Sequence, residues 1–207
     1  LHLDRMDAHC RVVGTPLHCA AFMGHLDIVK LLIARGADVD CRTIAGTHVI
    51  GGTPLHEASR DGHAAVVQCL IAAGAGANAK ANGNRTALHY ASKGEVARLL
   101  LAGGTEADVA DTDGWRPLDY AVRDNRNDVV RELANAGVGL TLHAAVLLGD
   151  REKMASLIAG GADVNACDMI GRTPLYLAPT GEVASLLIAG GADVNFDGAY
   201  GHVALTH

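Results

Sequence analysis

One short phrase occurs four times along the 207 residues of this chain. Its copies are Gly14-Thr15-Pro16-Leu17-His18, Gly52-Thr53-Pro54-Leu55-His56, Arg85-Thr86-Ala87-Leu88-His89 and Arg172-Thr173-Pro174-Leu175-Tyr176. Each copy precedes two apolar runs, and a Gly-Ala-Asp-Val-Asn-like close follows at 36–40, 161–165 and 191–195. Self-similarity at a period of about 33 residues is the sequence signature of stacked structural repeats. We therefore expect each unit to bury its apolar face against its neighbours.

The position of the repeated threonine defines the register of the units. It falls at Thr15, Thr53 and Thr86, and by alignment at Arg116, Leu140, Thr173 and Val203, with spacings of 38, 33, 30, 24, 33 and 30. The long first interval carries about five extra residues at 43–47, and the 24-residue interval lacks a connecting loop at 137–143. The 30-residue intervals predict a first helix that ends early, which Pro179 reinforces in one of them. The recurring order of spacings indicates a duplicated three-unit block.

Helix pairs are predicted over residues 16–34, 54–72, 87–102, 117–136, 141–159 and 174–189. The second helices carry apolar residues at helical spacing, as at Val66, Val67 and Leu70. A glycine follows each pair, and we expect it to end the helix in the left-handed conformation that glycine permits. These glycines are Gly36, Gly74, Gly104, Gly137, Gly161 and Gly191.

Thr-Pro-Leu-His at the start of a 33-residue unit resembles the ankyrin repeat, and the resemblance covers nearly the whole chain. It implies an all-α ankyrin-repeat solenoid of helix-turn-helix units joined by hairpin-like loops called fingers. One right-handed curved stack without a continuous β-sheet is expected, as a single array over 1–207. Its repeats lie near 10–42, 48–80, 81–110, 111–138, 139–167 and 168–197, with partial repeats at both ends.

The resemblance also implies roles for particular residues. In ankyrin repeats the histidine of the phrase hydrogen-bonds to the backbone of the adjacent finger, which implies a structural role for His18, His56, His89 and His143. Asn165 and Asn195 match an asparagine that is hydroxylated in many ankyrin repeats. The junction at 137–140 lacks a finger and carries two glycines, so we expect it to be the weak point of the array, where residues 1–138 and 139–207 differ in orientation or open independently.

Ankyrin-like arrays bind partner proteins through the finger tips and the ends of the first helices, which line one concave face. Apolar, aromatic and Arg side chains at positions without a packing role are the kind that interface hot spots favour. The candidate partner-binding residues are Phe22, Met23, Arg42, Val49, Ile50, Arg60, Asp61, Asn82, Arg85, Trp115, Arg123, Leu147, Leu148, Met169 and Ile170. The alternative is that single exposed apolar residues are ordinary, or that the inserted finger folds over Val49 and Ile50.

Composition argues against other classes of partner. The net charge is −6 without a block of Lys or Arg, whereas a nucleic-acid site needs a basic stripe. No apolar run approaches 18 residues and no signal peptide opens the sequence, so a membrane partner is not expected. Five cysteines without a Cys-x-x-Cys pair indicate reduced thiols and a cytoplasmic chain.

No residues suggest a metal, a cofactor or catalysis. His9-Cys10, and Cys41 with His48, lack closed ligand spacing. After His56-Glu57, the second histidine of a zinc-protease motif would stand at 60, which is Arg60. No nucleophile with a base can be assembled, so we expect no catalytic residues and no enzyme activity.

The sequence thus predicts a non-enzymatic scaffold that binds a partner protein through the concave face. One alternative is the targeting or regulatory arm of a larger enzyme, or of a secreted bacterial effector delivered to a host cytosol. Self-association is a third possibility, because a stack without polar caps exposes apolar ends.

Overall fold

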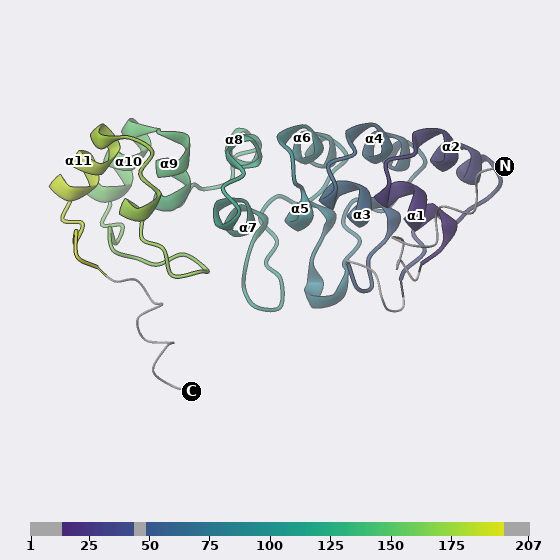
Figure 1. The fold of residues 1–207 in the computed structure, drawn as a ribbon, viewed down its shortest axis with the longest axis horizontal. Helices are drawn as coiled ribbons and strands as arrows, with labels where there is room; N and C mark the ends of the chain where they lie inside the picture. Colours follow the sequence, from purple (N-terminus) through teal and green to yellow (C-terminus); the bar gives the residue numbers. More distant parts are fainter. Residues whose placement is uncertain (1–13, 44–48, 197–207) are drawn as a thin grey trace. The chain divides into compact units, whose positions relative to one another are not determined.

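The computed structural model describes residues 14–43 and 49–196, and its regular secondary structure in those ranges is helical, with no strand (Figure 1). The partial repeats expected at both ends, the repeat position at Val203, and residues 44–47 of the predicted insertion lie outside the described residues. The helices are α1 (Pro16–Phe22), α2 (Leu26–Ala34), α3 (Pro54–Arg60), α4 (Ala64–Ala72), η1 (Asn82–Asn84), α5 (Ala87–Tyr90), α6 (Gly94–Ala102), α7 (Pro117–Arg123), α8 (Asn127–Asn135), α9 (Leu142–Leu148), α10 (Arg151–Ala159), η2 (Leu175–Leu177) and α11 (Gly181–Ala189). The predicted helix pairs and the absence of a sheet are confirmed for the described chain.

The chain divides into two compact units, with the boundary after Pro117. This boundary lies one helix pair before the finger-less junction at 137–140. Whether the chain behaves as a single array over 1–207 stays a prediction.

In the first unit the helices form two rows (Figure 1). The inner row is α1, α3 and α5, which pack on one another in sequence, and the outer row is α2, α4 and α6. Leu17, Leu55 and Leu88 occupy the same place in successive inner helices, and each is at most 1% exposed. The repeated phrase therefore supplies one core side chain per repeat, at the contact between neighbouring repeats.

The start of each inner helix follows from the threonine of the phrase. Thr15, Thr53 and Thr86 are extended N-cap residues, and the backbone N–H of Thr53 donates to Nδ1 of His56 (3.1 Å). Proline at the first helical position costs no hydrogen bond, because that N–H has no partner within a helix. Threonine and proline thus fix where the inner helix begins.

The predicted early ends are also present. Helix α5 ends at Tyr90 after four residues, and η2 is a single 3-10 turn that ends at Leu177. In the second case Pro179 follows, and the residue before it, Ala178, has ψ 115° instead of a helical value. All six glycines predicted to close the outer helices have positive φ, between 85° and 96°.

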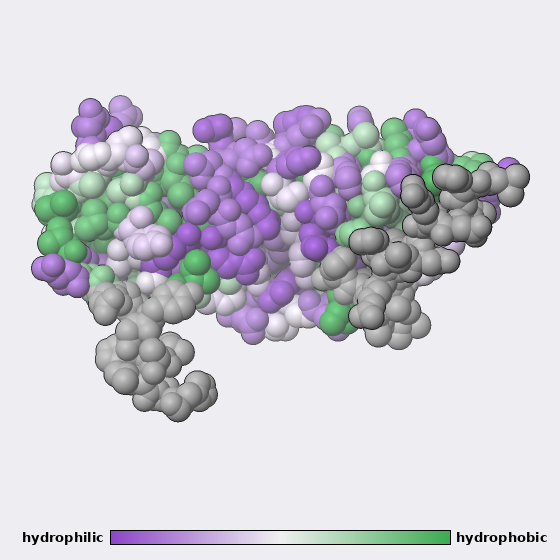
Figure 2. Space-filling model, viewed as in Figure 1, coloured by the Kyte–Doolittle hydropathy of each residue, from purple (hydrophilic) through white to green (hydrophobic). Residues whose placement is uncertain are grey.

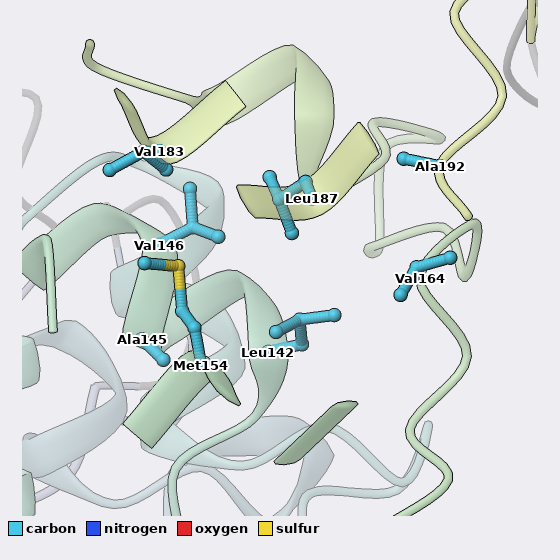
Figure 3. Close-up of a cluster of buried hydrophobic side chains, with 8 residues drawn as sticks. All are labelled: Leu142, Ala145, Val146, Met154, Val164, Val183, Leu187 and Ala192. Atoms are coloured by element: carbon cyan, nitrogen blue, oxygen red, sulfur yellow. The ribbon is translucent and has the colours of Figure 1, made fainter. Parts of the chain in front are cut away.

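The second unit has its own core, formed where α9, α10 and α11 meet (Figure 3). Met154 and Leu187 are 0% exposed and lie beside Val146 and Leu142. Across the junction, Thr141 caps α9 by accepting from the backbone N–H of Ala144 (3.3 Å). Helix α8 packs directly on α9, so the missing finger does not separate the two helix pairs.

Arg172 compensates for that missing finger within the second unit. It lies in the finger after α10, and its guanidinium donates to the carbonyls of Val122 (2.9 Å) and Arg123 (3.0 Å) at the end of α7. The last carbonyls of a helix have no N–H donor within the helix, so they need a donor from elsewhere. The same guanidinium pairs with Asp168 of its own finger at 2.7 Å, and its side chain is 10% exposed. One side chain thus connects two helix pairs across the junction.

Candidate protein-binding face

The fingers are hairpins closed by one backbone hydrogen bond at the same place in each repeat. Ala81 N–H donates to Arg85 O (2.8 Å), Asp111 to Trp115 (2.8 Å), and Asp168 to Arg172 (2.9 Å). The Asp111 carboxylate also accepts from the backbone N–H of Trp115 at 3.0 Å, which stabilises the turn. We call the surface formed by these fingers and the ends of the inner helices the finger face.

Neighbouring fingers of the first unit are tied together. The N–H of Asn82 donates to Ile50 O (3.0 Å), and the N–H of Thr112 donates to Gly83 O (2.9 Å). The Arg42 guanidinium donates to the carbonyl of Lys80 in the next finger. Loops held in this way lose little conformational entropy when a partner binds, which favours recognition.

The histidines of the phrase make the contacts expected of them at three positions. Nε2 of His18 donates to Gly52 O (3.2 Å), that of His56 to Arg85 O (3.1 Å), and that of His143 to Arg172 O (3.0 Å). His89 is likewise buried, and its Nδ1 accepts from the N–H of Thr86 (3.1 Å). Because a carbonyl oxygen can only accept, the neutral rings of His18, His56 and His143 carry their single proton on Nε2.

Burial is the largest cause of the lowered pKa of all four rings, and for His56 it lowers the pKa from 6.5 to about 4. The unfolded chain then binds protons that the folded chain does not bind between pH 4 and 6.5. This contribution to stability is complete above about pH 6.5. It falls as the pH drops, by about 1.4 kcal/mol per pH unit for one such histidine.

The apolar candidates of the first unit differ in exposure. Met23 and Ile50 are 47% and 51% exposed, and Phe22 is half-buried. Val49 is only 1% exposed, so the expectation that it projects from the finger tip is wrong. Its N–H donates to Oε1 of Glu57 (3.3 Å) and its carbonyl accepts from Thr43 Oγ1 (3.0 Å), which hold it against the inner helix.

The polar and aromatic candidates of the first unit mostly border solvent. Arg42 and Asn82 are exposed, whereas Arg60, Asp61 and Trp115 are half-buried. Arg85 is half-buried as well, and its Nε donates to the buried carboxylate of Asp111 at 2.9 Å. That arginine holds two fingers together in addition to facing outward.

In the second unit every candidate is half-buried: Arg123, Leu147, Leu148, Met169 and Ile170. Arg123 makes a bidentate pair with Asp124 (2.7 and 3.0 Å) and lies over the ring of Tyr120, 4.8 Å from its centroid. In Figure 2 the surface over α7 and α8 is strongly hydrophilic, and the surface over α10 and α11 is more hydrophobic. The surface of this unit over α7 and α8 thus differs in chemistry from the surface over α10 and α11.

Two residues that matter to this face were not singled out from the sequence as binding candidates. Glu57 is fully buried in α3, and burial raises the pKa of its carboxyl group. Asp40 closes a contact between repeats, because its carboxylate accepts from the backbone N–H of Gly76 (2.9 Å). The residues three and four positions away from Glu57 are Thr53, Pro54, Arg60 and Asp61, so no local pattern in the sequence marks Glu57 as buried.

The described residues offer no site of three other kinds: metal centre, membrane span or disulfide. No group of three His, Cys, Asp or Glu side chains there is arranged to hold a metal ion. No described helix has both the length and the hydropathy needed to cross a lipid bilayer. The four described cysteines, at 19, 41, 69 and 167, are free thiols.

Comparison with known proteins agrees with this architecture. The family model for ankyrin repeats (3 copies) matches residues 55–141, and that for the ankyrin repeat matches residues 14–44. The putative ankyrin repeat protein FPV223 of fowlpox virus is 31% identical over 104 residues, which cover 45% of this chain and 74% of that protein. The chain belongs to the ankyrin-repeat family, whose repeats are generally protein–protein interaction modules without catalytic activity.

Two human relatives are much longer than their match. Ankyrin repeat and SOCS box protein 3 is 32% identical over 94 residues, 40% of this chain and 18% of that protein. Ankyrin repeat domain-containing protein 49 is 67% identical over 30 residues, 14% of this chain and 13% of that protein. Among solved structures, the human ASB11 ankyrin repeat domain matches with a TM-score of 0.65 and 28% identity, over 90% of this chain and 88% of that one.

Proposed function

We propose that this chain is a non-enzymatic protein-binding scaffold whose partner docks on the finger face of the first unit. The observation that carries the proposal is the exposure of Met23 and Ile50, 47% and 51%, on a surface of mutually bonded fingers. Large apolar side chains without a packing role are characteristic of interaction surfaces. Pre-ordered fingers reduce the entropic cost of docking.

Capture of partners by matched variants tests this proposal. Met23→Ser with Ile50→Ser removes apolar surface from the finger face, whereas Ile28→Ser with Leu31→Ser removes it from outer helix α2, where those residues are 42% and 52% exposed. We expect both variants to keep their helical content and the first variant alone to lose the proteins captured by the wild type. Equal loss from both variants would contradict a specific finger face.

The same fold also suits the interaction arm of a larger enzyme or effector. This second candidate is favoured by the relatives, because this chain spans only 18% of the human protein whose name couples ankyrin repeats with a SOCS box. The full reading frame tests it. A catalytic signature outside these residues supports the second candidate, and its absence from the frame contradicts it. In either case the repeats act by binding a protein, and we place the chain in the cytoplasm or in a host cytosol.

A further inference from the structure

Three polar side chains at the end of inner helix α3 meet without completing their hydrogen bonds. Nη1 of Arg60 lies 3.9 Å from Oε2 of Glu57 and 3.9 Å from Oδ2 of Asp61. Both distances exceed a hydrogen bond by about 1 Å. In the part of the chain that the structure describes, each of these three atoms is buried and has no hydrogen-bond partner.

Burial makes this arrangement unusual. The Glu57 side chain is 0% exposed, and its other oxygen, Oε1, already accepts from the backbone N–H of Val49. Buried polar atoms in native proteins nearly always have a partner, because leaving one unsatisfied costs free energy. The side chains of Arg60 and Asp61 are 34% and 29% exposed, so the cluster borders solvent on the finger face. The three unsatisfied atoms are themselves buried, so a group from outside reaches them when the partly exposed side chains of Arg60 and Asp61 move apart.

The number of donors and acceptors that are missing defines the group that fits. Glu57 Oε2 and Asp61 Oδ2 each need a donor, and Arg60 Nη1 needs an acceptor. A carboxamide supplies two N–H donors and one carbonyl acceptor, which matches all three. An ammonium or guanidinium supplies donors only and is repelled by Arg60, and a carboxylate supplies acceptors only.

We propose that Glu57, Arg60 and Asp61 form a binding site for one carboxamide side chain, Asn or Gln, of the partner protein. The site rests on the proposed function, because it names the chemistry that the finger face recognises at α3. A single water that enters the free site also has two donors and can accept from Arg60. The partner's carboxamide displaces it and reproduces its hydrogen bonds, so that affinity is gained without leaving a polar atom unsatisfied.

Peptides selected from a random displayed library against the wild-type chain provide the test. Peptides that lose binding to the Met23→Ser, Ile50→Ser variant define the set directed to the finger face. In that set we expect an Asn or Gln whose replacement by Asp or Glu lowers affinity about tenfold, the effect of losing a hydrogen bond to a charged group. This loss should disappear in Asp61→Ala and Arg60→Ala, and persist in the outer-helix control Arg98→Ala.

Because Glu57 is fully buried, only the two partly exposed residues are substituted, and unchanged thermal unfolding verifies that both variants fold. Peptides that require the finger face but contain no essential Asn or Gln would overturn the carboxamide site and leave the proposed function intact. An essential Lys or Arg instead would also overturn it. Peptides that bind the finger-face variant as tightly as the wild type would contradict the proposed function itself, and the site with it.

Discussion

Replacing Arg172 by Ala probes how the second unit holds together across its finger-less junction. The wild-type guanidinium donates to Val122 O (2.9 Å), Arg123 O (3.0 Å) and Asn125 Oδ1 (3.2 Å), and it pairs with Asp168 at 2.7 Å. The side chains of this pair are 10% and 6% exposed. The substitution therefore removes bonds that solvent replaces poorly.

The expected loss of stability follows from this burial. A hydrogen bond to a charged group contributes about 1.5–3 kcal/mol, and breaking a buried ion pair costs about 3–5 kcal/mol. In the variant, the Asp168 carboxylate still accepts from the backbone N–H groups of Ile170 (3.0 Å) and residue 172 (2.9 Å), so it retains two hydrogen bonds. We expect a loss of about 3 kcal/mol, toward the lower end of these values. The stability of Arg172→Lys should lie between those of the wild type and Arg172→Ala, because an ammonium retains the charge but not the planar fork of donors.

Arg151→Ala is the matched control. Arg151 pairs with Glu182 at 2.8 Å in the same unit, but the two side chains are 59% and 75% exposed, and such pairs contribute less than about 1 kcal/mol. Urea unfolding gives the two free-energy changes, and hydrogen exchange of α7 reports local opening. Equal stability of the two variants, or unchanged protection of α7 in Arg172→Ala, would refute the bridging role.

Three further predictions concern the described residues. His56→Gln should flatten the loss of stability between pH 6.5 and 4 by up to about 1.4 kcal/mol per pH unit, measured by unfolding at several pH values; an unchanged slope would contradict the linkage. Gly24→Ala should destabilise more than Gly36→Ala, although both have positive φ, because a Cβ at Gly24 would lie 2.5 Å from the His63 ring and at Gly36 meets nothing within 4 Å; equal melting temperatures would contradict this. Amides flanking 137–140 should exchange faster than those within α9 and α10, and uniform protection would show that the deleted finger has no effect on opening.

The helices could be predicted from sequence because their signals are local. Thr53 and Pro54 fix the start of an inner helix, and Gly74 ends the following outer helix with φ 89°. The short α5 and η2 also followed from repeat length. Such signals act within a few residues of the structure they specify, so no knowledge of distant contacts is needed.

The finger face could be predicted only in part, because contacts between repeats decide it. Position alone placed Val49 and Ile50 together at a finger tip. In the structure the carboxylate of Glu57 accepts from the N–H of Val49, and the Val49 side chain is buried. The partners of Arg172 lie 49 and 50 residues away along the chain, beyond any periodic pattern. The duplicated block did not predict these contacts of Arg172, because the equivalent residue in the first block, Arg85, pairs with Asp111.

Hydrogen exchange on the chain with a captured partner tests the central claim most directly. Binding through the finger face predicts slowed exchange at the fingers 81–85 and 111–115 and at the end of α3, with α2, α4 and α6 of the outer row unchanged. The fingers are suited to this measurement because several of their backbone N–H groups, such as those of Ala81, Asn82 and Thr112, donate hydrogen bonds whose opening can be followed. Protection confined to the outer helices, with the fingers unchanged, would contradict the account.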